Sequence, residues 1–201
     1  QNRHISTMKT SFIILMLALG MSLQGCSLFS LQQNSSELNI QLDQIQSWQV
    51  RGKLSVVSKQ EAATGYLTWI QDNDEYDLFL SGPFGQGSSH LIGNNQYASL
   101  SIGGEEPVIA ESAEQLMYQQ LGWQFPVLDI RYWVKGQASP HSKAQISKND
   151  MGLLEDLIQH GWQVNFSRYQ RQGDVWLPSR IKISGHQLKF TFVIKEWTFS
   201  G

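Results

Sequence analysis

The sequence predicts a mainly β protein with a few helices (α+β), in which a large antiparallel sheet curls around an apolar inner face. Three observations support this fold class. Apolar and polar residues alternate in many short segments, Gly-rich or polar turns separate these segments, and only two or three stretches have helical spacing. The chain of 201 residues, 41% of them hydrophobic, is long enough to bury the core of one domain.

The first 25 residues have the pattern of a bacterial export signal. Lys9 follows Met8, an apolar run occupies residues 12–19, and Leu-Gln-Gly precedes Cys26. The apolar run is too short to span a bilayer. We expect residues 1–7 to be an upstream extension, residues 1–25 to be removed as a signal peptide, and residues 26–35 to form a polar tether.

Cys26 is the only cysteine in the chain, so it cannot form an internal disulfide. Its surroundings resemble the signal of bacterial lipoproteins, in which this cysteine becomes the acylated first residue. Three acyl chains would hold the protein on a membrane almost permanently. By the same resemblance, Ser27 in place of Asp implies the outer membrane. A soluble export product and an uncleaved anchor are the alternatives.

A first helix is expected at about residues 36–46, where Leu38, Leu42 and Ile45 repeat at helical spacing. The period then changes to two. Segments 48–56, 67–69, 76–80 and 100–102 each place apolar residues on one side, which indicates an antiparallel meander with one apolar face.

Helical spacing returns at about residues 111–121, where Ser112 can cap the helix and Gly122 ends it, and again at about 128–134. Strands resume at Trp162 and continue to Ile194, which gives about ten strands in all. Strand twist makes a sheet of this size curl, and so few helices cannot cover both of its faces. Its inner face is therefore either a filled core or a partly open cavity.

The sequence lacks the common catalytic, nucleotide and metal motifs. It contains no HExxH, G-x-S-x-G or P-loop pattern, and its histidines have no metal-ligand spacing. A net charge of −2 and a pI of about 6.2 show no excess of positive charge of the kind that binds nucleic acid. Scattered carboxylates could pair for hydrolysis, as in a cell-wall glycosidase, but their spacing does not indicate it. We expect no enzyme activity, no cofactor and no metal.

The segment SGPFGQGSS, residues 81–89, places an aromatic ring in a turn. Gly82, Pro83 and Gly85 supply the backbone angles that a turn needs, so the turn itself does not require Phe84. The ring either packs back onto the nearest core residues or is kept exposed for a function.

Seven short motifs, taken in order, resemble the LolB family of outer-membrane lipoprotein receptors. Each motif alone is weak, but the ordered series is specific and runs from about residue 48 to residue 197. The motifs are WQVRGKL at 48–54, GYLTW at 65–69, GPFG at 82–85, GWQFP at 122–126, YWVKG at 132–136, QHGW at 159–162 and LPSR at 177–180.

This resemblance implies an incomplete antiparallel barrel, residues 36–201, with a helical lid over a hydrophobic cavity. It implies a lipid-anchored monomer that faces the periplasm of a Gram-negative bacterium. Such a receptor accepts triacylated lipoproteins from the periplasmic carrier LolA and inserts them into the inner leaflet of the outer membrane. The resemblance also assigns Phe84, where the family often has Leu, to the membrane-insertion step, with Gly82, Pro83 and Gly85 forming its loop.

The alternation of the strands and the apolar side of the lid helix supply the residues expected to contact acyl chains. These are Trp48, Val50, Leu54, Leu67, Trp69, Leu78, Leu80, Leu116, Trp133 and Phe192. A shift of one residue in register would replace them by Tyr66, Ile70 and Phe79. Two other classes stay open: a tethered carrier of lipid or lipopolysaccharide without insertion activity, and a structural lipoprotein with a filled core.

Overall fold

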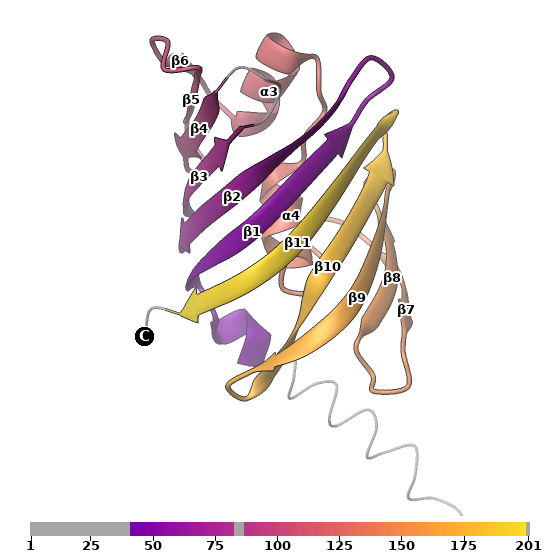
Figure 1. Cartoon of the computed structure of the whole chain (residues 1–201). Coiled ribbons are helices and arrows are strands. Elements are labelled where there is room, and N and C mark those ends of the chain that lie inside the picture. Colours follow the sequence, from indigo (N-terminus) through magenta and orange to yellow (C-terminus); the bar gives the residue numbers. More distant parts are fainter. Residues whose placement is uncertain (1–40, 83–86, 200–201) are drawn as a thin grey trace, which may run out of the picture. The chain divides into compact units, whose positions relative to one another are not determined.

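A computed structural model describes residues 41–82 and 87–199, and one antiparallel sheet of eleven strands dominates it (Figure 1). Two helices, α3 (Ala113–Leu121) and α4 (Val127–Trp133), separate the strands into two groups, and residues 41–44 are also helical. The strands are β1 (Ser47–Val57), β2 (Ala62–Asp72), β3 (Glu75–Ser81), β4 (Ser88–Gly93), β5 (Ala98–Ile102), β6 (Val108–Ala110), β7 (Gln145–Lys148), β8 (Leu154–Gln159), β9 (Trp162–Gln172), β10 (Val175–Gly185) and β11 (Leu188–Phe199).

The strand order is β6-β5-β4-β3-β2-β1-β11-β10-β9-β8-β7. Each described strand pairs with its neighbours in sequence, except that β6 and β7 do not pair with each other, and β1 also pairs with β11. Among the described strands, β6 and β7 form the two edges and do not pair with each other, so the sheet is not closed. The prediction of a mainly antiparallel sheet with few helices is confirmed.

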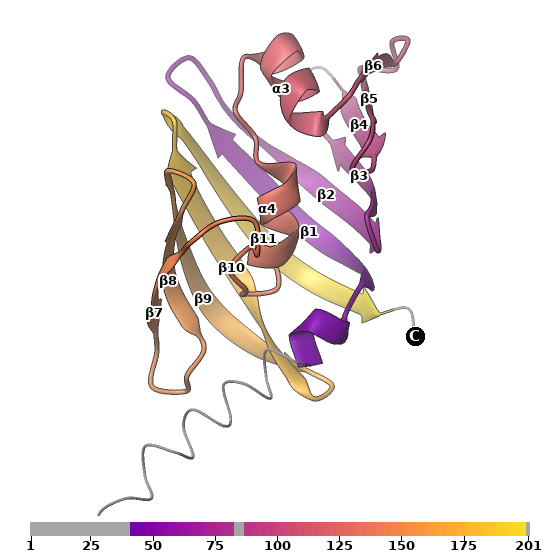
Figure 2. The ribbon, with the colours of Figure 1, turned by 180° about the vertical axis from the view of Figure 1, so that it is seen from behind.

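Helices α3 and α4 both lie over the same face of the sheet, which is its inner face (Figure 2). On β1, the side chains of Trp48, Val50 and Leu54 point to this face and are buried, whereas Arg51 and Lys53 are exposed on the opposite, outer face. The outer face also carries the exposed residues of the alternative register, Tyr66, Ile70 and Phe79. That register therefore does not occur.

The signals at the ends of α3 act as the sequence predicts. The side chain of Ser112 accepts a hydrogen bond from the backbone N–H of Gln115, at 3.1 Å. Gly122 ends the helix in the left-handed region, with φ of 68°, and its N–H donates to the carbonyl of Tyr118. The helix buries Leu116 and Met117 against the inner face of the sheet.

The connection that includes α4 is fixed to the sheet by the side chain of Gln159, which ends β8 and is only 1% exposed. Its Nε2 donates to the carbonyls of Ser139, at 2.7 Å, and Ser142, at 2.9 Å. Its Oε1 accepts from the N–H of Ser139 and from Nε1 of Trp133, both at 3.0 Å. One buried amide thus joins β8, α4 and the segment that follows it.

Within the described ranges, no helix is long and apolar enough to cross a membrane. The expected signal peptide and tether, together with Cys26, lie outside the described residues. The same is true of residues 36–40, at the start of the first predicted helix, whose described part is helical over 41–44.

Candidate functional site

An apolar cavity of about 60 Å³ lies beneath α3, on the inner face of the β1–β5 half of the sheet. Among the residues that the structure describes, none that lines the cavity is charged, and Ser89 is the only polar one. The lining consists of Leu54, Val56, Leu67, Leu78, Leu80, Ser89, Leu91, Leu100, Met117, Leu121, Trp123, Phe125 and Phe190.

Four of the residues expected from the sequence line this cavity: Leu54, Leu67, Leu78 and Leu80. The other six belong to the same hydrophobic core but do not line it; they are Trp48, Val50, Trp69, Leu116, Trp133 and Phe192.

Large rings fill the space around two of these six residues. The ring of Trp48 lies 5.1 Å from that of Trp69 and 5.4 Å from that of Trp197, measured between ring centres. A small cavity of about 20 Å³ lies beside Trp48.

The segment after α3 supplies residues that the sequence analysis did not place in the cavity. Trp123 and Phe125 lie in the GWQFP motif, and both rings pack edge-on against Phe190. Met117 and Leu121 come from the apolar side of the predicted lid helix, so helical spacing was a sufficient signal for them. Nothing in the local pattern shows that residues 123–125 enter the core.

The cavity is much smaller than the open hydrophobic space that the resemblance implies. A volume of about 60 Å³ holds only about four water-sized groups, whereas a long acyl chain has more than about a dozen carbons. The free space at the inner face is small because the rings of Trp123, Phe125 and Phe190 occupy part of it. A chain of that length would fit beneath α3 only after a movement of these rings or of the helix.

Helix α3 is held mainly by apolar contacts near one edge of the sheet, where it packs on β5 and β6. A hydrogen bond of 3.2 Å from the N–H of Leu128 to Oε1 of Glu114 also joins this helix to α4. Apolar packing is not directional, so it restricts the position of a helix less than a network of hydrogen bonds does.

The loop between β3 and β4 is closed at its base by Gly82, whose N–H donates to the carbonyl of Gly87 at 2.8 Å. Gly82 has a φ of 76°, which favours glycine. Pro83, Phe84 and Gly85 lie outside the described residues. The role expected for Phe84 stays a prediction.

Lys135 is buried where the N-terminal described segment meets the YWVKG motif. Its side chain is 4% exposed, and its Nζ donates to the carbonyls of Leu42, at 3.2 Å, and Ile45, at 3.1 Å. Desolvation lowers the pKa of Lys135 to about 8, although the nearby Asp43 carboxylate opposes this shift. This lysine fixes the start of the described chain to the body of the domain.

We expect the stability contributed by Lys135 to rise with pH above about 8. The unfolded chain keeps this proton up to about pH 10.5, so between the two values it binds more protons than the folded chain. Urea unfolding should show the stability of the wild type increasing relative to Lys135→Met by up to about 1.4 kcal/mol per pH unit from pH 8 to 9.5. A constant difference over this range would contradict the burial of the amine, and the exposed Lys189→Met provides the control.

In the part of the chain that the structure describes, no three His, Cys, Asp or Glu side chains are grouped to hold a metal ion. His160 of the QHGW motif lies with its Nδ1 2.7 Å from Oδ2 of the buried Asp129, and so links β8 to α4. The motif residues Gln159 and His160 both act in this attachment.

The family model described as "Outer membrane lipoprotein LolB" matches residues 46–197, from the start of β1 almost to the end of β11. The chain belongs to the LolB family. Curated LolB relatives named outer-membrane lipoproteins include one from Pseudomonas paraeruginosa, 40% identical over 78% of this chain and 77% of the relative. Another LolB protein, from Pseudomonas fluorescens, is 36% identical over 87% of this chain and 90% of its own length.

Solved structures share the fold of this LolB-family chain at low sequence identity. A LolA-superfamily protein from Nitrosomonas europaea is similar over 83% of this chain and 94% of its own, with a TM-score of 0.55 and 9% identity. A DUF1329-family protein from Desulfovibrio piger is similar over 84% of this chain and 92% of its own, also with a TM-score of 0.55, and 7% identity. These likenesses concern the fold alone.

Proposed function

We propose that this chain is a receptor that accepts triacylated lipoproteins from the periplasmic carrier LolA and inserts them into the inner leaflet of the outer membrane. The observation that carries the proposal is the apolar cavity beneath α3, whose described lining contains no charged residue, in a member of the LolB family. Acyl chains leave water for such a surface without any nucleotide or metal.

Lipidation of Cys26 would keep the receptor at the membrane that takes the cargo. In this proposal residues 1–25 are the signal peptide, residues 26–35 form the tether, and residues 36–201 form the lipoprotein-binding domain. The domain works as a monomer on the periplasmic side of the outer membrane.

Cargo uptake in this proposal is an exchange of apolar contacts. Met117 and Leu121 of α3, with the rings of Trp123 and Phe125, fill the space that the acyl chains take. The chains displace these side chains and contact the leucines of β1, β2 and β3, including Leu54, Leu67, Leu78 and Leu80. Because the rings gain burial again when cargo leaves, the empty state favours release to the bilayer.

The loop that carries Phe84 assists the release step. A buried ring of this size gains roughly 1.5–3 kcal/mol on leaving water, which draws the loop to the bilayer surface but does not anchor the protein. Such weak, reversible contact suits a receptor that repeats the delivery.

The proposal is tested by mixing the protein with LolA that is loaded with a lipoprotein, in the absence of nucleotide, and measuring how much cargo moves. We expect one-way transfer for the wild type. Filling the cavity with Leu80→Trp should reduce transfer at least about tenfold, the equivalent of 1.4 kcal/mol. The matched control is Phe79→Trp, on the same strand but on the outer face.

Three results would contradict this proposal in whole or in part. If no lipoprotein moves from LolA to the wild-type protein, then the protein is not a receptor for this donor. Equal transfer by Leu80→Trp, Phe79→Trp and the wild type excludes the cavity as the place of acyl binding. Cargo that moves to the protein but never to vesicles favours a tethered carrier without insertion activity.

A further inference from the structure

The outer face of the sheet, which neither α3 nor α4 covers, carries a group of basic side chains on neighbouring strands. Together we name them the basic outer face. They are Lys53 on β1, Lys189 on β11, Arg180 and Lys182 on β10, and Arg168 on β9. Arg180 is half-exposed and the other four are exposed.

These side chains are close to one another because of the register. Lys53 is opposite Val193, and Val193 is opposite Arg180, so one row across β1, β11 and β10 holds both cations. Lys182 lies two residues from Arg180 on the same face. Neighbouring strands are about 4.8 Å apart, so the group forms one continuous surface.

None of the five basic residues forms an ion pair with any residue that the structure describes. Two acidic side chains lie on strands of the same sheet. Glu196 faces Arg51 at 3.9 Å, and Asp156 accepts a hydrogen bond from the uncharged side chain of Asn165 at 3.1 Å. The positive charge of this face is therefore open to an external anionic partner.

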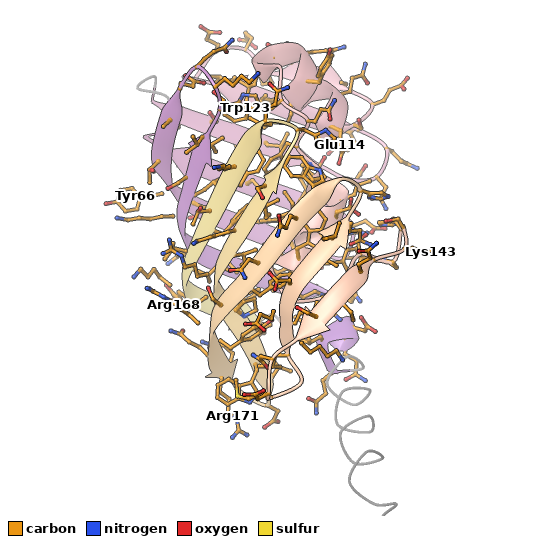
Figure 3. All side chains as sticks on the ribbon, turned by 90° about the vertical axis from the view of Figure 1, so that its right-hand side faces the viewer. Tyr66, Glu114, Trp123, Lys143, Arg168 and Arg171 are labelled. Atoms are coloured by element: carbon orange, nitrogen blue, oxygen red, sulfur yellow. The ribbon has the colours of Figure 1, made fainter. Side chains whose placement is uncertain are left out.

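This concentration of positive charge contrasts with the rest of the molecule. The whole chain has a formal net charge of −2, and residues 91–130, which include α3 and most of α4, contain no Lys or Arg. The segment that includes α3 therefore carries acidic residues such as Glu114 and no cation, unlike the basic outer face with its labelled Arg168 (Figure 3).

An exposed aromatic ring lies beside the basic outer face. Tyr66 of β2 is 66% exposed and is opposite Lys53, whose Nζ lies 5.2 Å from the ring centre. Figure 3 shows Tyr66 and Arg168 projecting on the side of the sheet opposite to Glu114. Tyrosine with neighbouring lysine and arginine is a combination enriched where proteins meet the headgroup region of a bilayer.

The chain connectivity keeps this face near a membrane. Fourteen residues lie between Cys26 and Gln41, where the described structure begins, and this segment can span at most about 50 Å. A domain tethered at this distance meets the bilayer at a high effective concentration, so a weak surface is sufficient to orient it.

We propose that the basic outer face is a docking surface for a bilayer that contains anionic phospholipids, and that it holds the sheet against that bilayer while the helix side faces the periplasm. The inference rests on the proposed function, because it assumes a membrane-anchored receptor. Phosphate-bearing headgroups attract the five cations, and Tyr66 enters the interface beside them.

The test uses the complete lipidated protein in vesicles. With Cys26 acylated, a Thr64→Cys replacement on the outer face of β2 provides the single free thiol for a fluorescent label. Quenching by a lipid-borne quencher should be at least about twofold stronger in vesicles with about 30% phosphatidylglycerol than in pure phosphatidylcholine. It should return to the neutral-vesicle level in about 0.5 M NaCl.

Charge variants with matched controls identify the responsible residues. Lys53→Glu with Lys182→Glu should remove the extra quenching, whereas Lys53→Arg with Lys182→Arg should keep it. Lys143→Glu with Lys148→Glu, which makes the same change of charge away from this face, should also keep it. A label at Tyr118→Cys, on the exposed side of α3, should show no effect of lipid composition.

Equal quenching in both kinds of vesicle would overturn the inference, and so would an unchanged response in the Lys53→Glu, Lys182→Glu variant or equal quenching at the α3 label. Cargo transfer is measured in the same vesicles. Normal delivery without contact at this face rejects the docking surface and leaves the receptor function intact. Contact without any transfer supports the docking surface and rejects the receptor function.

Discussion

Replacing Phe84 by Glu should stop the delivery of lipoproteins into a bilayer while leaving uptake from LolA close to that of the wild type. The wild-type ring gains roughly 1.5–3 kcal/mol on leaving water, and a carboxylate loses this gain and opposes entry. Delivery to vesicles should fall by at least about tenfold, since each 1.4 kcal/mol is a factor of ten. The measurement is the amount of cargo found in vesicles and on the receptor after mixing with a loaded donor.

Phe84→Leu is the matched control for this experiment, because it keeps an apolar side chain at the loop and should deliver cargo normally. Thermal unfolding of both variants verifies that the fold is unchanged. Normal delivery by Phe84→Glu would show that the loop serves only as a turn, in which case the ring has no part in insertion.

Gln159→Leu should produce the largest loss of stability of any single replacement considered for this chain. It removes four hydrogen bonds at once and leaves buried groups of Trp133, Ser139 and Ser142 without a partner. Each unpaired buried group costs about 1–3 kcal/mol, so the total exceeds about 3 kcal/mol. Urea or thermal unfolding measures the effect.

The control is Gln163→Leu, an exposed position on β9, which should change stability by less than about 0.5 kcal/mol. Since Gln159 joins β8 to α4, its loss should also make α4 and the segment after it exchange amide hydrogens faster than the strands do. Unfolding of Gln159→Leu at the same urea concentration as the wild type would exclude this amide as the link.

Alternation along the strands was sufficient to predict the sheet and its inner face, because burial on one side imposes a period of two on long strands such as β1, β2 and β11. Strand β7, at one edge of the sheet, was not predicted because it lacks this alternation of buried and exposed residues. All four residues of β7 are exposed, so Gln145–Lys148 has no apolar side to detect. The pairing of β1 with β11 also has no local signal.

Residues of the cavity could be predicted only where the alternation of apolar and polar residues within a single strand places them on the inner face. Leu54, Leu67 and Leu78 each follow from the alternation of their own strand, and all three line the cavity. The size of the free space at the inner face depends on side chains from the connection after α3, such as Trp123 and Phe125, which pack against Phe190. A pattern within a single strand contains no information on that packing.

The pairing of β1 with β11 determines when this protein can finish folding. Apart from the ladder between β1 and β11, strands β1 to β6 pair only with sequence neighbours within their group, as do β7 to β11, so each meander can form from short loops. The ladder between the groups joins residues about 130 or more positions apart, and contacts this distant form slowly. A chain that emerges N-terminus first therefore keeps one edge of β1 unpaired until the residues of β11 are synthesised. During that interval the nascent protein is most prone to aggregate and most in need of a chaperone.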